Sequence, residues 1–60
     1  MIKTKFKIGD HVHIIQSHKD GFRQGCWGEI VDISPRGGTL LIKGNHVTLP
    51  HPARKVEIIS

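Results

Sequence analysis

The sequence predicts an all-β domain of five short strands that bends into a small barrel. Short apolar segments alternate with polar residues at a period of two, and clusters of glycine and proline separate these segments. Sixty residues form a single domain, residues 1–60, and so short a chain buries only about 60% of the surface that its unfolded form exposes. A strongly bent barrel suits such a chain, because it hides its edges without a second layer.

The N-terminal third is predicted to contain an extended segment, a strand and a long loop. Residues 3–8 alternate between charged and apolar side chains, so Phe6 and Ile8 should face inward. After the turn signal Gly9-Asp10, residues 11–15 form a half-buried strand with Val12 and Ile14 on one face. Residues 16–27 have no sustained periodicity and contain two glycines, which predicts a long, mobile loop.

The middle of the chain is predicted to form two strands joined by a turn. Gly28 precedes a β-branched strand at residues 29–33, whose apolar spacing indicates burial on both faces or a bulge. Proline and paired glycines at residues 34–38 are typical of a turn. Residues 39–43 then form the third strand of the sheet.

The C-terminal part should complete the sheet. Gly44-Asn45 has the composition of a two-residue hairpin turn, which would lead into a strand at residues 46–49 with Val47 and Leu49 inward. The prolines of Pro50-His51-Pro52 should end that strand, because proline cannot donate a hydrogen bond to a ladder. Residues 53–55 have room for one helical turn, and residues 56–59 form the last strand.

Composition favours a basic, cytoplasmic protein. Nine Lys and Arg against five Asp and Glu give a net charge of +4, which favours phosphate-rich or acidic partners. The lone Cys26 excludes an internal disulfide framework and indicates a reducing compartment. No apolar segment approaches the roughly 20 residues of a membrane span, and the N-terminus lacks the apolar stretch of a signal peptide, so we expect no membrane partner.

Three segments together carry a family resemblance: Phe6-Lys7-Ile8-Gly9-Asp10-His11-Val12, Gly28 with Glu29-Ile30-Val31-Asp32-Ile33, and Ala53-Arg54-Lys55-Val56-Glu57-Ile58-Ile59. With them, nearly the whole chain resembles SH3-like barrels of the KOW type. KOW motifs occur in ribosomal proteins and transcription elongation factors, where they bind RNA, DNA or polymerase. The resemblance thus implies a five-stranded SH3-like barrel that contacts nucleic acid or a machine that processes it.

The same signature is also similar to small photosynthetic accessory subunits and to type II dihydrofolate reductases. The reductase pore is lined by a Val-Gln-Ile-Tyr segment. The comparable stretch here is Val47-Thr48-Leu49-Pro50, which argues against that chemistry.

The predicted loop has the composition of a single-strand binding site. Lys19 and Arg23 can neutralise phosphates, while Phe22 and Trp27 can stack on bases. The alternative interpretation is structural: Trp27 would cover the open end of the barrel, and Phe22 would pin the loop. Exposed aromatic side chains would serve a protein partner equally well.

The other basic residues either converge into a stripe that follows phosphates or form an ordinary solvated surface. A period of two places three lysines of the N-terminal segment on one face. The residues concerned are Lys3, Lys5, Lys7, Arg36, Lys43, Arg54 and Lys55.

Metal and catalytic sites have little support in the sequence. His11 and His13 have a spacing that can chelate a metal, but no second ligand pair with a recognisable spacing accompanies them. The five carboxylates are dispersed, and Cys26 lacks a motif that would stabilise an oxyanion. We therefore expect no metal, no cofactor and no catalytic residues.

The sequence thus predicts a non-catalytic accessory or regulatory factor that contacts nucleic acid, a ribosome or an RNA polymerase. Binding should be largely independent of base sequence, because the basic groups offer few bidentate base readers. The alternative is a protein interaction module or an accessory subunit of a complex. Self-association through an exposed strand remains open, since the core is thin.

Overall fold

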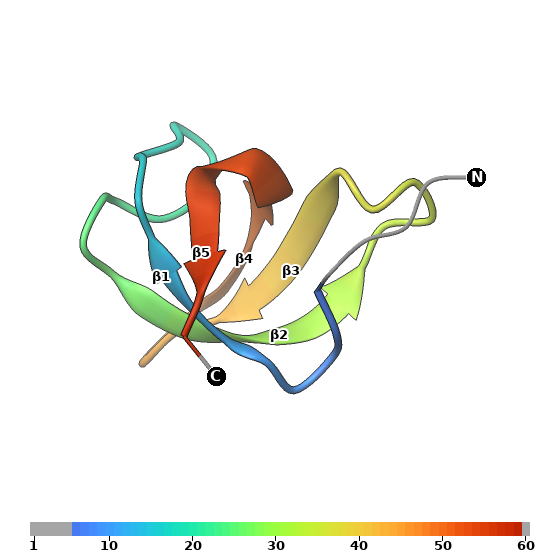
Figure 1. Ribbon diagram of the computed structural model, residues 1–60. Coiled ribbons are helices and arrows are strands. Elements are labelled where there is room, and N and C mark those ends of the chain that lie inside the picture. The colour runs from blue at the N-terminus through green and yellow to red at the C-terminus, as the bar shows by residue number, and fades with distance from the viewer. Residues whose placement is uncertain (1–5, 60) are drawn as a thin grey trace.

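The computed structural model describes residues 6–59, in which five strands form one antiparallel sheet. The elements follow in the order β1 (His11–Ile14), β2 (Trp27–Ile33), β3 (Thr39–Lys43), β4 (Thr48–Pro52), the 3₁₀ turn η1 (Ala53–Lys55) and β5 (Val56–Ile58). The all-β prediction is confirmed. Within the sheet the strand order is β4-β3-β2-β1-β5, and Figure 1 shows the strong bend of the sheet and the η1 turn that leads from β4 to β5.

The sheet is open rather than closed. β4 and β5 form its two edges, and no strand pairing joins them within residues 6–59. The same part of the chain contains no helix long and apolar enough to cross a membrane.

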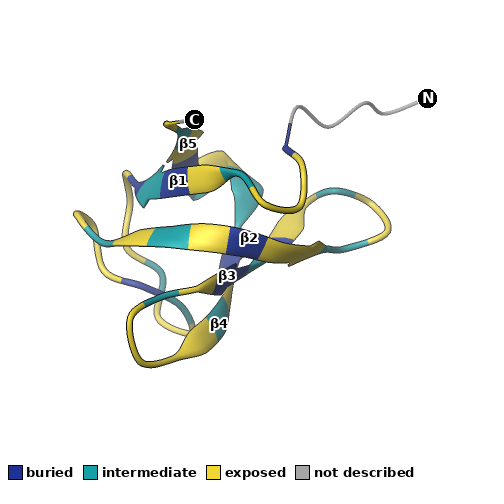
Figure 2. Ribbon diagram, turned by 90° about the horizontal axis from the view of Figure 1, so that it is seen from below, coloured by how far each residue is buried: buried dark blue, intermediate teal, exposed yellow. Residues whose placement is uncertain are grey.

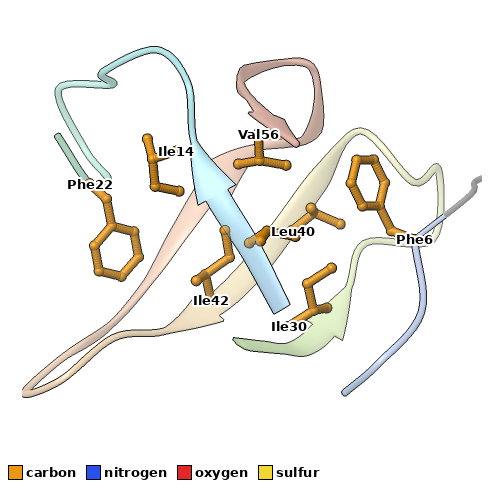
Figure 3. Packing of buried hydrophobic residues seen from close by; sticks show 8 residues of the cluster. Phe6, Ile14, Phe22, Ile30, Leu40, Ile42 and Val56 are labelled. Atoms are coloured by element: carbon orange, nitrogen blue, oxygen red, sulfur yellow. The ribbon is translucent and has the colours of Figure 1, made fainter. Parts of the chain in front are cut away.

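Alternation along the strands places the core on the concave face of the sheet. In β1, Val12 and Ile14 are fully buried as predicted, and Ile30, Leu40 and Ile42 join them from β2 and β3. β1 has two buried residues separated by a half-buried one, and β2 has one buried residue between exposed neighbours; Figure 2 shows both strands coloured by burial. The core is closed by Phe6, Phe22 and Val56, and Figure 3 shows the two phenylalanine rings at opposite ends of the cluster.

β2 contains a bulge, one of the two alternatives that its apolar spacing left open. Ile30 pairs with Ile42, whereas Asp32 pairs with the adjacent Leu41, so Val31 has no partner in β3. Such an extra residue bends and twists a strand, which helps the sheet to curve around its small core.

The extended segment predicted at residues 3–8 is only partly described, because Lys3 and Lys5 lie outside residues 6–59. Phe6 is buried as expected, but the inward placement of Ile8 is wrong, since this side chain is 65% exposed. The reason is a turn over residues 7–10: the Lys7 amide donates to the Asp10 carboxylate at 3.0 Å, and the Asp10 amide donates to the Lys7 carbonyl at 3.0 Å.

The predicted two-residue hairpin turn at Gly44-Asn45 is also wrong. Lys43 pairs with Thr48, so residues 44–47 form a four-residue connection, in which the Gly44 amide donates to the Val47 carbonyl at 2.8 Å. Val47 lies in this turn and is exposed, whereas Leu49 packs against the core.

β4 continues through the two prolines that were expected to end it. Pro50 pairs with Leu41 and Pro52 with Thr39. Because β4 is an edge strand, proline is tolerated where its missing N–H would face away from the sheet. The strand at residues 46–49 is therefore shifted to Thr48–Pro52, and His51 is brought inside.

Candidate functional site

Trp27 projects from the outer face of the sheet. It begins β2 rather than ending the loop, and Gly28 beside it faces the core, where a Cβ atom would collide with the Ile42 side chain. Alternation therefore turns the indole outward, and 64% of Trp27 is exposed. Trp27 is paired with His13 of β1, and the two ring centroids lie 5.1 Å apart at an interplanar angle of 41°. Trp27 does not cover an end of the core.

A row of charged and polar side chains crosses the same face beside Trp27. His11 of β1 is paired with Glu29 of β2, and Glu29 is paired with Lys43 of β3. All three residues are exposed. Because residues 27 and 29 are two positions apart in one strand, this row lies on the face that carries the indole.

Two hollows adjoin Trp27. The first has a volume of about 310 Å³ and is lined by His11, Trp27, Gly28, Glu29, Lys43, Gly44 and Asn45. The second, of about 500 Å³, is lined by Phe22, Cys26, Trp27, Gly44, Asn45, His46 and Val47. Trp27, Gly44 and Asn45 line both, so the hollows adjoin each other. We call the first the polar hollow and the second the apolar hollow.

Phe22 contributes to the wall of the apolar hollow, but its ring is not presented to solvent. Only 8% of the residue is exposed, and it belongs to the core cluster. A Cβ atom at Gly44 would lie 2.8 Å from Phe22 Cε1, so the absence of a side chain at Gly44 makes room for the ring. The predicted stacking of a base on Phe22 would need an exposed ring, whereas the observed burial favours the alternative, in which Phe22 pins the loop.

His51 attaches the long loop to β4. Its ring is fully buried, the Phe22 amide donates to Nδ1 at 3.1 Å, and Nε2 donates to the Gln16 carbonyl at 3.0 Å. An acceptor at Nδ1 and a donor at Nε2 define the neutral ring. Burial is the main cause that lowers the pKa of His51 below its usual 6.5; the Gln16 carbonyl opposes this, while His18 and Lys55 lower the pKa further.

Most of the predicted basic residues do not line the hollows beside Trp27. Of the described ones, only Lys43 lines a hollow beside it. Lys55 instead contacts the long loop, with Nζ 3.3 Å from His18 Nδ1. The other cations are exposed on the long loop, the first turn, the β2–β3 turn and η1. These residues are Lys7, Lys19, Arg23, Arg36 and Arg54.

The histidines and Cys26 are not arranged as a metal centre. Within the described part of the chain, no three His, Cys, Asp or Glu side chains form a group that could hold a metal ion. Cys26 is a free, partly buried thiol.

The predicted site omitted Glu29, Asn45 and the stacking partner His13. The loop was predicted to end at residue 27 and the next strand to begin at residue 29. In the structure both residues belong to β2, where their spacing of two places them on the same face. Asn45 was predicted to lie in a two-residue turn. The connection over residues 44–47 is longer, and Asn45 lines both hollows.

Comparisons of this chain with protein-family models, with curated proteins and with solved structures give no match.

Proposed function

We propose that this chain is a non-catalytic binding domain that engages single-stranded nucleic acid, alone or within a ribosome or RNA polymerase, through the surface around Trp27. The observation that carries the proposal is the exposed Trp27, which lines both hollows and shares the polar hollow with Lys43. An exposed aromatic ring offers a stacking platform for a base, and a neighbouring cation can neutralise its phosphate. The net charge of +4 supports the same class of ligand.

An SH3-like arrangement is part of this proposal. The strand order β4-β3-β2-β1-β5, the strong bend and the short 3₁₀ turn before the last strand support it. Together with the sequence resemblance to KOW-type domains, they favour a cytoplasmic accessory or regulatory role in nucleic-acid metabolism.

Fluorescence gives a direct test, because Trp27 is the only tryptophan and the chain has no tyrosine. Titration with unstructured DNA and RNA oligonucleotides should quench the indole, and the affinity should fall as salt rises, since phosphate contacts release counterions. Labelled-oligonucleotide anisotropy should show that Trp27→Ala weakens binding about fivefold or more, the range of one lost stacking contact.

Ile8→Ala is the matched control, since Ile8 is 65% exposed and lines neither hollow. It should leave the affinity unchanged. Equal binding by the wild type and Trp27→Ala, or an affinity that ignores salt, would contradict the proposal.

The apolar hollow favours a second candidate, a protein interaction module. Val47 is exposed there beside Trp27, and Phe22 and Cys26 form part of the wall, a lining that suits an apolar side chain of a partner. A pull-down from a nuclease-treated lysate separates the two functions. A protein that is retained by the wild type, lost with Trp27→Ala and insensitive to nuclease would favour the interaction module.

A further inference from the structure

The residues that line the polar hollow carry groups of the kinds that can bind the edge of a nucleobase. They include Trp27 with its indole, Glu29 with a carboxylate, Lys43 with an ammonium group and Asn45 with an amide. Its volume of about 310 Å³ is at the lower end of the range of about 300–1,000 Å³ that is typical of small-ligand sites. That size suits a single base better than a larger ligand.

Glu29 and Lys43 face each other across β2 and β3 without neutralising each other. They are register partners, which places their Cβ atoms on the same face at neighbouring positions. In the part of the chain that the structure describes, neither side chain is engaged in an ion pair or a hydrogen bond. Both therefore remain available to a ligand, one as an acceptor and the other as a donor.

A carboxylate next to an ammonium group matches one base better than the others. The Watson–Crick edge of guanine presents two adjacent donors, N1–H and the N2 amino group, followed by the acceptor O6. Adenine and cytosine place a single donor group beside acceptors, and uracil and thymine place one donor between two acceptors. Only guanine can satisfy both oxygens of a carboxylate and also accept from a neighbouring cation.

We infer that the polar hollow is a guanine-selective subsite for a single strand. The base stacks on Trp27, Glu29 accepts from N1–H and N2, and Lys43 donates to O6. Base stacking combined with hydrogen bonds to the Watson–Crick edge is a common way for proteins to read unpaired nucleotides. This inference rests on the proposed function. It departs from the sequence-independent binding that the composition predicts, because Glu29 adds a carboxylate residue to the lining of the hollow.

The test compares labelled thymidylate hexamers that differ at one central position, thymine, adenine or guanine, by fluorescence anisotropy at fixed pH and salt. The guanine hexamer should bind the wild type about fivefold or more tightly than the other two, in line with one bidentate base contact. Glu29→Gln should abolish this preference, since an amide offers one acceptor where the carboxylate offers two.

Glu57→Gln provides the matched control. Glu57 is exposed on β5, where it pairs with His13, and it lines neither hollow. The Glu57→Gln substitution therefore makes the same change in charge outside the subsite. It should leave the guanine preference intact. A preference that survives Glu29→Gln, or that Glu57→Gln abolishes equally, would overturn the assignment.

Failure of the inference can be told apart from failure of the proposed function. If all three hexamers bind equally and Trp27→Ala still weakens each of them, the guanine subsite is wrong and the nucleic-acid function stands. If no hexamer binds, the guanine subsite is wrong, and the proposed function is wrong as well when the unstructured DNA and RNA oligonucleotides also fail to bind.

Discussion

At the scale of single residues, burial distinguishes the role of Trp27 from that of Phe22, whereas the composition of the loop does not. Both aromatic side chains flank the same apolar hollow, and the sequence allowed each to stack on a base or to fill the fold. The structure exposes 64% of Trp27 and only 8% of Phe22. The difference arises because Trp27 occupies a position of β2 whose side chain points away from the core. Phe22 instead packs into the space that the missing side chain of Gly44 leaves.

Alanine substitutions at these two positions should therefore affect different properties. Phe22→Ala should lower the free energy of unfolding by about 3–5 kcal/mol, the usual cost of truncating a buried phenylalanine. Trp27→Ala should lower it by about 1 kcal/mol or less, because the ring is largely solvated. Urea denaturation followed by circular dichroism measures both. A larger loss for Trp27→Ala than for Phe22→Ala would show that the indole is the structural residue.

At the scale of elements, the long loop is held against the sheet by the buried His51 of β4. The ring bonds to Phe22 and to Gln16, and a Cβ atom at Gly21 would lie 2.5 Å from Nδ1, so the backbone of the loop closely approaches the imidazole. Lys55 adds a contact from η1 to His18. The consecutive elements β4 and η1 thus position the loop that precedes Trp27.

This attachment should weaken in acid. The pKa of His51 is lower in the folded than in the unfolded protein, where it is about 6.5, so the unfolded state binds more protons once the pH falls below that value. Stability from the neutral ring is thus complete above pH 6.5 and is lost as the pH falls toward the folded pKa. A protonated Nδ1 would also face the Phe22 N–H, donor against donor.

Urea denaturation between pH 7.5 and 5.5 measures the effect. The wild type should lose stability over this range, and His51→Gln should be less stable than the wild type at pH 7.5, by about 1–3 kcal/mol, but depend less on pH. His46→Gln, which changes an exposed histidine, should retain the wild-type pH dependence. A pH dependence that is unchanged in His51→Gln would refute the role of this ring.

At the scale of the whole molecule, the open sheet leaves two edges that a sixty-residue chain must protect. β5 is only three residues long, and β4 contains two prolines. Pro50 and Pro52 lie two positions apart, so the missing N–H groups are on the same side of the strand, away from β3. An edge that lacks two of its outward N–H donors is a poorer template for pairing with a second chain.

Restoring these donors should promote self-association. The double variant Pro50→Thr, Pro52→Thr should form more dimer than the wild type at the same concentration, because β4 could then pair edge to edge. Sedimentation velocity over a range of concentrations measures the change. Pro35→Thr, in the β2–β3 turn, is the control that should leave the mass unchanged. If the double variant keeps the wild-type mass at every concentration, the prolines do not protect this edge.

Local patterns were sufficient where strand formation depends on neighbours in the sequence. Alternation located β1, and the turn signals on either side of residues 39–43 located β3. The β-branched spacing of residues 29–33 allowed burial on both faces or a bulge, and the structure has the bulge. The single helical turn before the last strand is present as η1. Errors arose where the outcome depends on distant residues. Proline ends a central strand but not an edge strand, and nothing near Pro50 in the sequence tells which kind of strand contains it.

The sequence by itself determined an all-β chain with a basic charge balance and a core drawn from alternating apolar residues, because these follow from composition and from the period of two. Only the tertiary structure decided that the sheet stays open, that His51 is buried while Ile8 and Val47 are exposed, and that Trp27, Glu29 and Lys43 share one face. The physical reason is that burial and register are set by cross-strand partners far away in the chain, whose positions no local pattern contains.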